Sequence, residues 1–350
     1  MIVTQKDVAR EAGVSVSTVS RVVRGANYTD AATRQRVLEA IRDLQYRPNA
    51  VARRLKYGRT YTIGFVINDI SNPFYGHAVM GVERYLSAAG EPEFELFLLN
   101  TSGDPRQEIR AVEVMLNKCV EGIILASTAT RECIDAVRAA AVEHHIPVVS
   151  IDNHLGGFEF GTVGADNQAG ACELTRHLLQ HGHTRIGIIG GPHAESHARE
   201  RAEGYAQALA EAGLGLDEEM VGAGNWSLED GYRITRGWLA LANPPTAIFG
   251  SNNFMSMGAL YAIRERRLRV PDDIAVVSFD DVEFGNLLRP CLTTLDYGWE
   301  KIGEEAARLV LEGVRAKDEH RGLQRVNLPV RLMVRESCGC LCQHELWAAV

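Results

Sequence analysis

The sequence has no apolar run that approaches the roughly 18 residues needed to cross a membrane. Its first ten residues, MIVTQKDVAR, include charged side chains and lack the apolar core of a signal peptide. Hydrophobic residues make up 46% and charged residues 23% of the 350, which is typical of a soluble protein with more than one core. We therefore expect a cytoplasmic protein with no membrane partner.

Signatures of catalysis are also missing. The glycines of GIIGGPH, residues 187–193, lack the third glycine spacing of a nucleotide-binding loop, and no lysine follows them. No GxSxG motif occurs. His181 and His183 occupy a predicted helix-to-strand turn without an HExxH spacing, so a turn is favoured over a metal site there. We expect no enzyme, no catalytic residue and no cofactor.

Cysteine is scarce and unevenly distributed. The chain has seven, an odd number that argues against a disulfide framework and for reduced thiols. Only Cys338, Cys340 and Cys342, followed by His344, are clustered. A structural zinc site usually needs CxxC spacing and a second ligand pair elsewhere, so the sequence favours a plain tail over residues 338–350 and no metal.

Charge is divided unequally along the chain. Residues 1–60 hold 12 basic and 5 acidic residues, a net charge of +7, whereas the remainder holds 25 basic and 40 acidic residues, a net charge of −15. A basic head on an acidic body is typical of a protein whose head alone meets a polyanion, although a solvated basic face would give the same balance.

Three short helices are predicted within residues 3–47. Thr4 can cap the first in a capping box with Asp7, and Gly13 can end it in a left-handed turn. Ser15 can cap a second helix, VSTVSRVV, and Thr29 can cap a third. Apolar residues recur at helical spacing in the third helix: Val37, Leu38, Ile41 and Leu44.

A helix, a short glycine-containing turn and another helix form the helix-turn-helix plan, whose second helix enters the DNA major groove. Val16, Ser17 and Arg21 are expected on its exposed face, with Val19 and Val22 inside. Ser17, Thr18 and Arg21 can hydrogen-bond to bases or phosphates, and Val16 can pack on a thymine methyl.

VTQKDVAREAGVSVSTVSRVVRG resembles the head of the LacI/GalR family of bacterial transcription regulators. The resemblance continues through residues 33–75 and, more loosely, to about residue 337. It implies a hinge, RPNAVARRLKYG, that becomes helical on operator DNA, pairs with the hinge of a dimer mate and wedges Leu55 between base pairs. DNA contacts are therefore expected from Thr4, Val16, Ser17, Thr18, Ser20, Arg21, Asn27, Tyr46, Asn49, Ala52, Arg53 and Leu55.

From Tyr61 onward, short apolar runs alternate with helical stretches. The apolar runs are TIGFVI, FELFLLN, GIILAS, PVVSID, RIGIIG, AIFG and AVVSFD. This alternation predicts an α/β body of parallel sheets flanked by helices. Its two comparable halves predict two lobes with a cleft, which agrees with the periplasmic-binding-protein-like body that the resemblance implies. Ligands bind such sheets at the carboxyl ends of strands.

Polar and aromatic residues follow several of these strands, and the resemblance supports pocket roles for most of them. The candidate effector site is Asp69, Asn72, Phe74, Asp152, Arg199, Arg201, Trp226, Asn252, Asn253, Asp280 and Trp299. Many family members have Asn-Asp where this chain has Asn252-Asn253, so this chain lacks a carboxylate that those members have. Carboxylates with two tryptophans favour a sugar or related polyol, with a purine or another small metabolite as the alternative.

These expectations define four parts of the chain. Residues 1–47 form the DNA-binding head, 48–60 the hinge and linker, 61–337 the effector-binding and dimerisation body, and 338–350 a tail. Within the body the N-lobe covers about 61–163 and 294–322, and the C-lobe about 164–293 and 323–337. The expected protein is a homodimeric repressor on a pseudo-palindromic operator in the nucleoid. A small-molecule-binding protein without a regulatory role is the alternative, and residues 1–60 argue against it.

Overall fold

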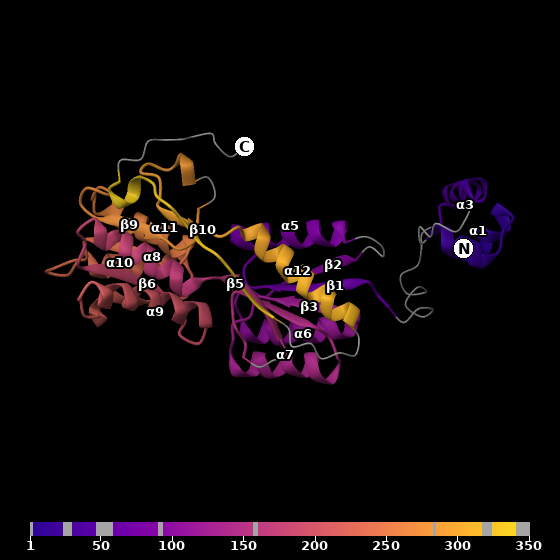
Figure 1. The fold of residues 1–350 in the computed structure, drawn as a ribbon, viewed down its shortest axis with the longest axis horizontal. Helices are drawn as coiled ribbons and strands as arrows, with labels where there is room; N and C mark the ends of the chain where they lie inside the picture. The colour runs from indigo at the N-terminus through magenta and orange to yellow at the C-terminus, as the bar shows by residue number, and fades with distance from the viewer. Residues whose placement is uncertain are drawn as a thin grey trace.

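The computed structural model describes residues 3–23, 30–46, 59–89, 94–156, 160–282, 285–316 and 324–340. Its helices and strands form a small all-helical head and a two-lobed α/β body (Figure 1). No described helix combines the length and the apolar character that spanning a bilayer requires. The predicted fold class is thereby confirmed.

The head packs three helices around a small core: α1 (Gln5–Ala12), α2 (Val16–Val23) and α3 (Ala31–Asp43). The predicted capping box is present, because the Thr4 backbone N–H donates to Asp7 Oδ2 over 3.0 Å. Gly13 ends α1 in the left-handed region at φ 64°. The Ser15 hydroxyl caps α2 by accepting from the Thr18 N–H over 3.1 Å.

Two details of the predicted head are wrong. Asp30, not Thr29, caps α3, since its Oδ1 accepts from the Thr33 N–H over 2.9 Å. Leu38 was expected in the apolar stripe but is 40% exposed, whereas Val37 is fully buried. The stripe is narrower than the sequence suggested because only one face of α3 covers the other two helices.

The N-lobe is a six-stranded parallel sheet in the order β11-β5-β4-β3-β1-β2. Its strands are β1 (Thr62–Ile67), β2 (Glu95–Asn100), β3 (Gly122–Leu125), β4 (Val148–Ile151), β5 (Phe160–Ala165) and β11 (Arg325–Leu328). Helices α5 (Pro73–Ala88) and α12 (Trp299–Ala316) cover one face, and α6 (Pro105–Lys118) and α7 (Arg131–Glu143) the other (Figure 1).

The close approach of α5 and α12 depends on two glycines. A Cβ at Gly81 would collide with the Glu300 backbone, and one at Gly303 would collide with the Ala78 backbone. The backbones of the two helices therefore contact each other directly at these glycines. This contact fixes the position of α5 relative to α12.

The C-lobe is a four-stranded parallel sheet in the order β7-β6-β8-β9. Its strands are β6 (Ile186–Gly190), β7 (Val221–Ala223), β8 (Ala247–Gly250) and β9 (Ala275–Ser278), and its helices are α8 (Asn167–Gln180), α9 (Ser196–Glu211), α10 (Leu228–Trp238) and α11 (Asn253–Glu265). Two cores on opposite faces of this sheet enclose it. Short 3-10 turns lie at Glu218–Met220, Gly285–Leu287 and Glu336–Cys338.

The chain passes between the lobes three times. The first passage follows β5, and the other two run through an antiparallel pair, β10 (Thr294–Asp296) and β12 (Arg331–Met333). The predicted boundaries need correction here, because residues 323–337 were assigned to the C-lobe. Strand β11 pairs with β5 instead, so this part of the chain returns to the C-lobe only after Leu328.

Candidate functional site

A small cavity of about 100 Å³ lies between the lobes, at the carboxyl ends of strands from both sheets. Eight of the eleven predicted effector residues line it: Asp69, Asn72, Phe74, Asp152, Arg201, Trp226, Asn252 and Asp280. They come from both lobes, as the switch from strand to loop at the sheet edges predicts. The structure therefore brings most of the predicted set together.

Arg201 is the buried cation of this cavity, with only 3% of its surface exposed. Its Nε donates to Asn167 Oδ1 over 2.9 Å, and its Nη1 donates to the Ser251 carbonyl and lies 3.9 Å from Asp280 Oδ1. The guanidinium also stacks on the Phe279 ring at 3.7 Å. The side chain is thus fixed before any ligand arrives.

Three acids face this single arginine. Burial raises the pKa of Asp152 to about 7, against the opposing charge of Arg201, and Asp280 adds to the rise. Burial likewise raises the pKa of Glu195 to about 7. Burial also raises the pKa of Asp280, although Tyr297 donates to its Oδ1 over 2.8 Å. The cavity therefore holds more carboxylate than its one cation can neutralise.

Asp152 stands out among the three acids. Its Oδ1 is shielded from solvent and has no hydrogen-bond partner among the described residues. Its backbone adopts φ 64°, a left-handed conformation that is costly for a residue with a Cβ. An unpaired buried carboxylate oxygen costs free energy, so Asp152 is an acceptor available to a ligand.

Trp226 forms one aromatic wall and also has a left-handed backbone, at φ 62°. Its ring stacks on the His197 ring with centroids 4.7 Å apart and 18° between planes. It also lies so close to Gly191 that a Cβ there would collide with it. The indole N–H donates to Glu195 Oε2 over 2.8 Å. Burial, then the charges of Arg201 and Arg199, hold the pKa of His197 well below 6.5, so this ring is neutral.

Hydrogen bonds across the cleft hold the lobes together. Asn153, which follows β4 of the N-lobe, accepts from the Ser196 N–H over 2.9 Å and lies 3.0 Å from His197 Nδ1. On the other side, Asn253 Nδ2 donates to Asn72 Oδ1 over 3.2 Å. Asn72 Oδ1 also accepts from the Phe74 N–H, so this oxygen acts as an acceptor. An asparagine at position 253 can donate to it, whereas an ionised aspartate has no donor.

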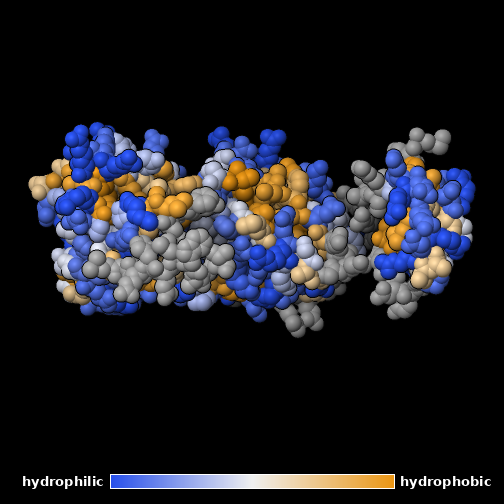
Figure 2. Space-filling model, turned by 90° about the horizontal axis from the view of Figure 1, so that it is seen from above, coloured by the Kyte–Doolittle hydropathy of each residue, from blue (hydrophilic) through white to orange (hydrophobic). Residues whose placement is uncertain are grey.

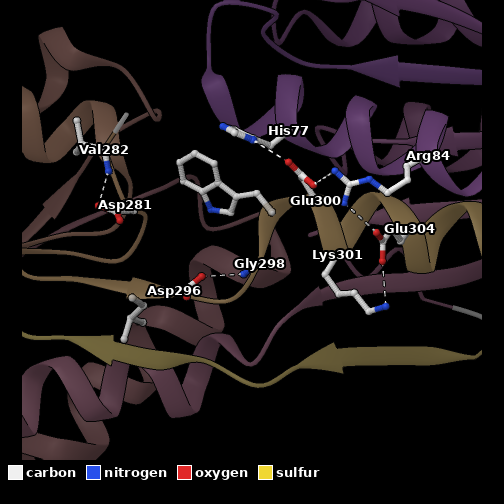
Figure 3. Close-up of a pocket in the computed structure, with 11 residues that line it drawn as sticks. His77, Arg84, Asp281, Val282, Asp296, Gly298, Glu300, Lys301 and Glu304 are labelled. Atoms are coloured by element: carbon white, nitrogen blue, oxygen red, sulfur yellow. Dashed lines mark hydrogen bonds and ion pairs between the residues drawn. The ribbon is translucent and has the colours of Figure 1, made fainter. Parts of the chain in front are cut away.

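Three predicted residues lie elsewhere. Arg199 donates to the carbonyls of His193 and Ala194 and so braces its own loop. Asn253 joins the lobes as described above. Trp299 lines a second hollow of about 540 Å³ between α5, α12 and the loop at Asp281 (Figure 3). The centroid of its ring lies 6.0 Å from that of Phe74, which lines the cavity.

Sequence reasoning missed Asn68, Tyr75, Glu195, His197, Phe254 and Tyr297, which also line the cavity. Glu195 and His197 lie at the start of α9, separated from the end of β6 by a loop. Arg199 and Arg201 were predicted beyond this same loop, but the residues before them on α9 were not considered. His197 lies one helical turn before Arg201, and this spacing was an available clue.

Some of the predicted DNA-contacting residues lie on the surface of the head, and others lie in its core. Ser17 and Arg21 are exposed on α2, Val16 and Thr18 are half-buried, and Val19 and Val22 face inward as expected. Ser20 is 3% and Tyr46 9% exposed, so both belong to the core of the head rather than to its surface. Thr4 is exposed and donates to Asp7 Oδ2 over 2.7 Å. Asn27, Asn49, Ala52, Arg53 and Leu55 lie outside the described residues.

Comparison with known proteins agrees with this architecture. The family described as "Bacterial regulatory proteins, lacI family" matches residues 4–49, and the "Periplasmic binding protein-like domain" matches residues 175–338. The ribose operon repressor of Escherichia coli is 34% identical over 95% of this chain and 99% of its own. The chain belongs to the LacI family of bacterial regulatory proteins.

Other LacI-family relatives are similar to this chain over nearly its whole length. The HTH-type transcriptional repressor PurR of Haemophilus influenzae is 34% identical over 95% of this chain and 98% of its own. The solved lac repressor dimer bound to operator is 27% identical with a TM-score of 0.82, over 97% of this chain and 99% of its own. The chain is accordingly a DNA-binding transcription repressor with a small-molecule effector.

The raised pKa of Asp152 makes a prediction about stability and pH. An acid whose pKa is higher when folded than when unfolded stabilises the fold at low pH and loses that contribution as pH rises toward the folded value. Between about pH 5 and pH 7.5, the stability of Asp152→Asn should therefore rise relative to the unmodified protein, by up to about 1.4 kcal/mol per pH unit. Chemical denaturation across this range measures the difference.

Asp135→Asn is the matched control, since this aspartate is exposed on α7, where it lies 3.2 Å from Arg138 Nη1. A pH-dependent stability difference specific to Asp152→Asn identifies the buried carboxyl as its source. A flat difference for Asp152→Asn would show that the carboxyl is ionised throughout this range.

Proposed function

We propose that the chain represses transcription as a homodimer and that its effector is a small sugar or related polyol bound in the cavity between the lobes. The observation that carries the effector assignment is the unpaired Oδ1 of Asp152 beside a nearly saturated arginine. A ligand rich in hydroxyl donors satisfies such a carboxylate, because each hydroxyl can donate to it while accepting from another group.

The lining as a whole supports the same class of ligand. Four carboxyl groups, those of Asp69, Asp152, Glu195 and Asp280, line the cavity with a single arginine. Vicinal hydroxyls can bridge paired carboxylate oxygens, and the flat Trp226 ring offers apolar contact to the C–H face of a sugar ring. Relatives named for sugars support this choice: the ribose operon repressor and the structure titled as a regulator CelR–cellobiose complex, 31% identical with a TM-score of 0.72.

The cavity's size narrows the choice. Its volume of about 100 Å³ is well below the roughly 300–1,000 Å³ of pockets that hold drug-sized ligands. A single small ring fits this space better than a disaccharide does. A purine is the second candidate, since relatives at similar identity are PurR repressors and the Trp226–His197 stack gives a planar ring a flat wall.

The proposed mechanism couples lobe closure to the hinge. Asn153 joins one lobe to α9 of the other, and Asn72 joins Asn253, so a ligand that bridges the lobes favours the closed arrangement. Closure changes how far apart the two N-lobes of a dimer hold their hinges. A coupling of about 1–3 kcal/mol would change operator affinity about 5–150-fold, in a direction set by which state the operator selects.

A homodimer is proposed from the surface of the N-lobe. The face seen in Figure 2 shows hydrophobic surface gathered over the region of α5. Met80 on this helix is 45% exposed, and Ile70, in the turn before it, is 63% exposed. A two-fold dimer also matches a pseudo-palindromic operator. Met80→Glu should convert dimers to monomers in sedimentation equilibrium, whereas Tyr261→Glu, at an exposed site on the C-lobe helix α11, should leave the dimer intact.

A thermal-shift screen tests the effector assignment. Pentoses, hexoses, sugar acids, polyols and nucleobases would each be added to the purified protein. A ligand at about 100 times its dissociation constant adds about 2.7 kcal/mol of stability, so a sugar or polyol should raise the melting temperature by a few degrees. The hit should be recovered chemically unchanged, as expected for a regulator that is not an enzyme. A shift with nucleobases alone would replace the sugar assignment by the purine one.

A further inference from the structure

Two pairs of metal-binding side chains meet at the far end of α8, away from the cleft. His177 lies in the last turn of α8 and His181 caps its C-terminus, four residues on, so both imidazoles share one face of the helix. Cys338 and Cys340 come from the segment that follows β12, more than 150 residues later in the sequence. Neither pair has a complete zinc signature alone. The sequence therefore favoured a turn at His181 and His183 and a tail at the cysteines, and it gave no reason to pair His181 with His177.

The distances bring His177, Cys338 and Cys340 to one point, and they place His181 beside Cys340. Cys340 Sγ lies 3.0 Å from His181 Nε2 and 3.8 Å from His177 Nε2. The ligand atoms of His177, Cys338 and Cys340 all lie within 4.8 Å of one another. A tetrahedral ion with Zn–S bonds of about 2.3 Å and Zn–N bonds of about 2.0–2.1 Å separates sulfur and nitrogen by about 3.5 Å.

We propose that His177, His181, Cys338 and Cys340 bind one Zn²⁺ ion in a structural Cys₂His₂ site. Two thiolates and two neutral imidazoles are a donor set that closed tetrahedral zinc sites use. Binding replaces the two thiol protons, which pass to solvent, and no electron is transferred. The end of a helix dipole is also a favourable place for a cation, and the site lies at the C-terminus of α8.

Two of the four proposed ligands are buried and two are closer to solvent. Cys338 is 1% and His177 8% exposed, so these ligands are fixed by the C-lobe core. Cys340 and His181 are more exposed and close the site from the solvent side. An ion can therefore reach the two inner ligands before the outer two complete its coordination.

The proposed ion would secure the third passage between the lobes. Directly before the cysteines, the Ser337 N–H donates to the Cys291 carbonyl over 2.9 Å and its hydroxyl donates to the Val276 carbonyl over 2.6 Å. Helix α8 in turn contacts β10 and β12, the pair that connects the lobes. Zinc would fix this segment to α8 and so stiffen the C-lobe side of the connection.

The test is a zinc titration of the full-length protein, stripped of metal under reducing conditions, against a chromophoric chelator. We expect one Zn²⁺ per chain. Cys340→Ser and His181→Ala should each weaken binding by more than the roughly 10–100-fold that loss of an outer-shell partner costs. Co²⁺ in place of Zn²⁺ should give the intense visible bands of tetrahedral cobalt and a thiolate charge-transfer band, which Cys340→Ser diminishes.

Matched controls separate these ligands from their neighbours. Cys119→Ser and His183→Ala change a half-buried cysteine and a nearby histidine outside the cluster, and both should retain full affinity. The double variant Cys342→Ser/His344→Ala should retain it as well. The proposal is overturned if the protein binds no Zn²⁺, if Cys340→Ser and His181→Ala bind as tightly as the unmodified protein, or if only the double variant loses binding. Operator binding by each variant shows that it is folded.

Discussion

Arg201→Ala should abolish the response to effector while operator binding persists. Among the residues that the structure describes, Arg201 is the one arginine that lines the cavity, and a ligand hydroxyl or ring nitrogen would meet its guanidinium at a fixed position. Truncating one partner of a buried charged hydrogen bond costs about 2–5 kcal/mol, which is roughly a 30-fold to several-thousand-fold loss of affinity. Fluorescence anisotropy of labelled operator, with and without the sugar or polyol that gives the largest thermal shift, measures both properties.

The same change also affects the unliganded cavity. Without Arg201, Asp280 and Asp152 lose the charge that opposes their elevated pKa, and the pKa of each acid should rise further. An uncompensated buried charge is strongly destabilising, so Arg201→Ala is expected to melt at a lower temperature. Arg201→Lys retains the charge but not the planar, two-pronged donor, and it tests whether geometry matters in a protein that stays more stable.

Arg199→Ala is the matched control. Arg199 is two residues away on the same helix and was predicted to share the pocket. Its Nη1 instead donates to the carbonyls of His193 and Ala194, and it does not line the cavity as far as the structure describes the chain. We expect its effector response to lie within a few-fold of the unmodified protein. An Arg201→Ala protein that responds at the same ligand concentration would place the effector elsewhere, with the hollow beside Trp299 as the next candidate.

The body could be predicted from the sequence to the extent that its strands are apolar. TIGFVI, AIFG and AVVSFD coincide with β1, β8 and β9, whose buried residues face helices on both sides. Strand β5, FGTVGA, was missed because its glycines and threonine dilute the apolar signal. β10 and β12 were missed because three residues form no detectable period.

Two signals predicted the cavity residues: a position soon after a strand, and, for Arg201 inside α9, the family resemblance. Asp152 and Asp280 follow β4 and β9 within two residues, so their place at the sheet edge could be predicted from the sequence. Glu195 and Tyr297 reach the cavity through a loop and through the β10 crossing, and only the fold places them there. The His177–Cys338 cluster is the extreme case, since its two halves meet only after the chain has crossed between the lobes a third time.

Arg21→Ala should weaken operator binding and relax its specificity. Arg21 is exposed in the last turn of α2, on the same face as Ser17, whose carbonyl it contacts at 3.3 Å in the absence of DNA. That contact is weak, so the guanidinium can turn toward a guanine or a phosphate. A bidentate contact to guanine contributes about 1–3 kcal/mol of discrimination, and a symmetric dimer makes it twice.

Selection of sites from random DNA followed by salt-dependent affinity measurements separates the two roles. If Arg21 reads a base, Arg21→Ala loses preference at one position of each half-site and its salt dependence changes little. If Arg21 holds a phosphate, affinity for every sequence falls together and the salt slope decreases by about one per head. Arg36→Ala, an exposed arginine on α3, should leave sequence preference intact. Unchanged affinity and preference in Arg21→Ala would mean that α2 does not present this side chain to DNA, and the orientation of the head on its operator would have to be revised.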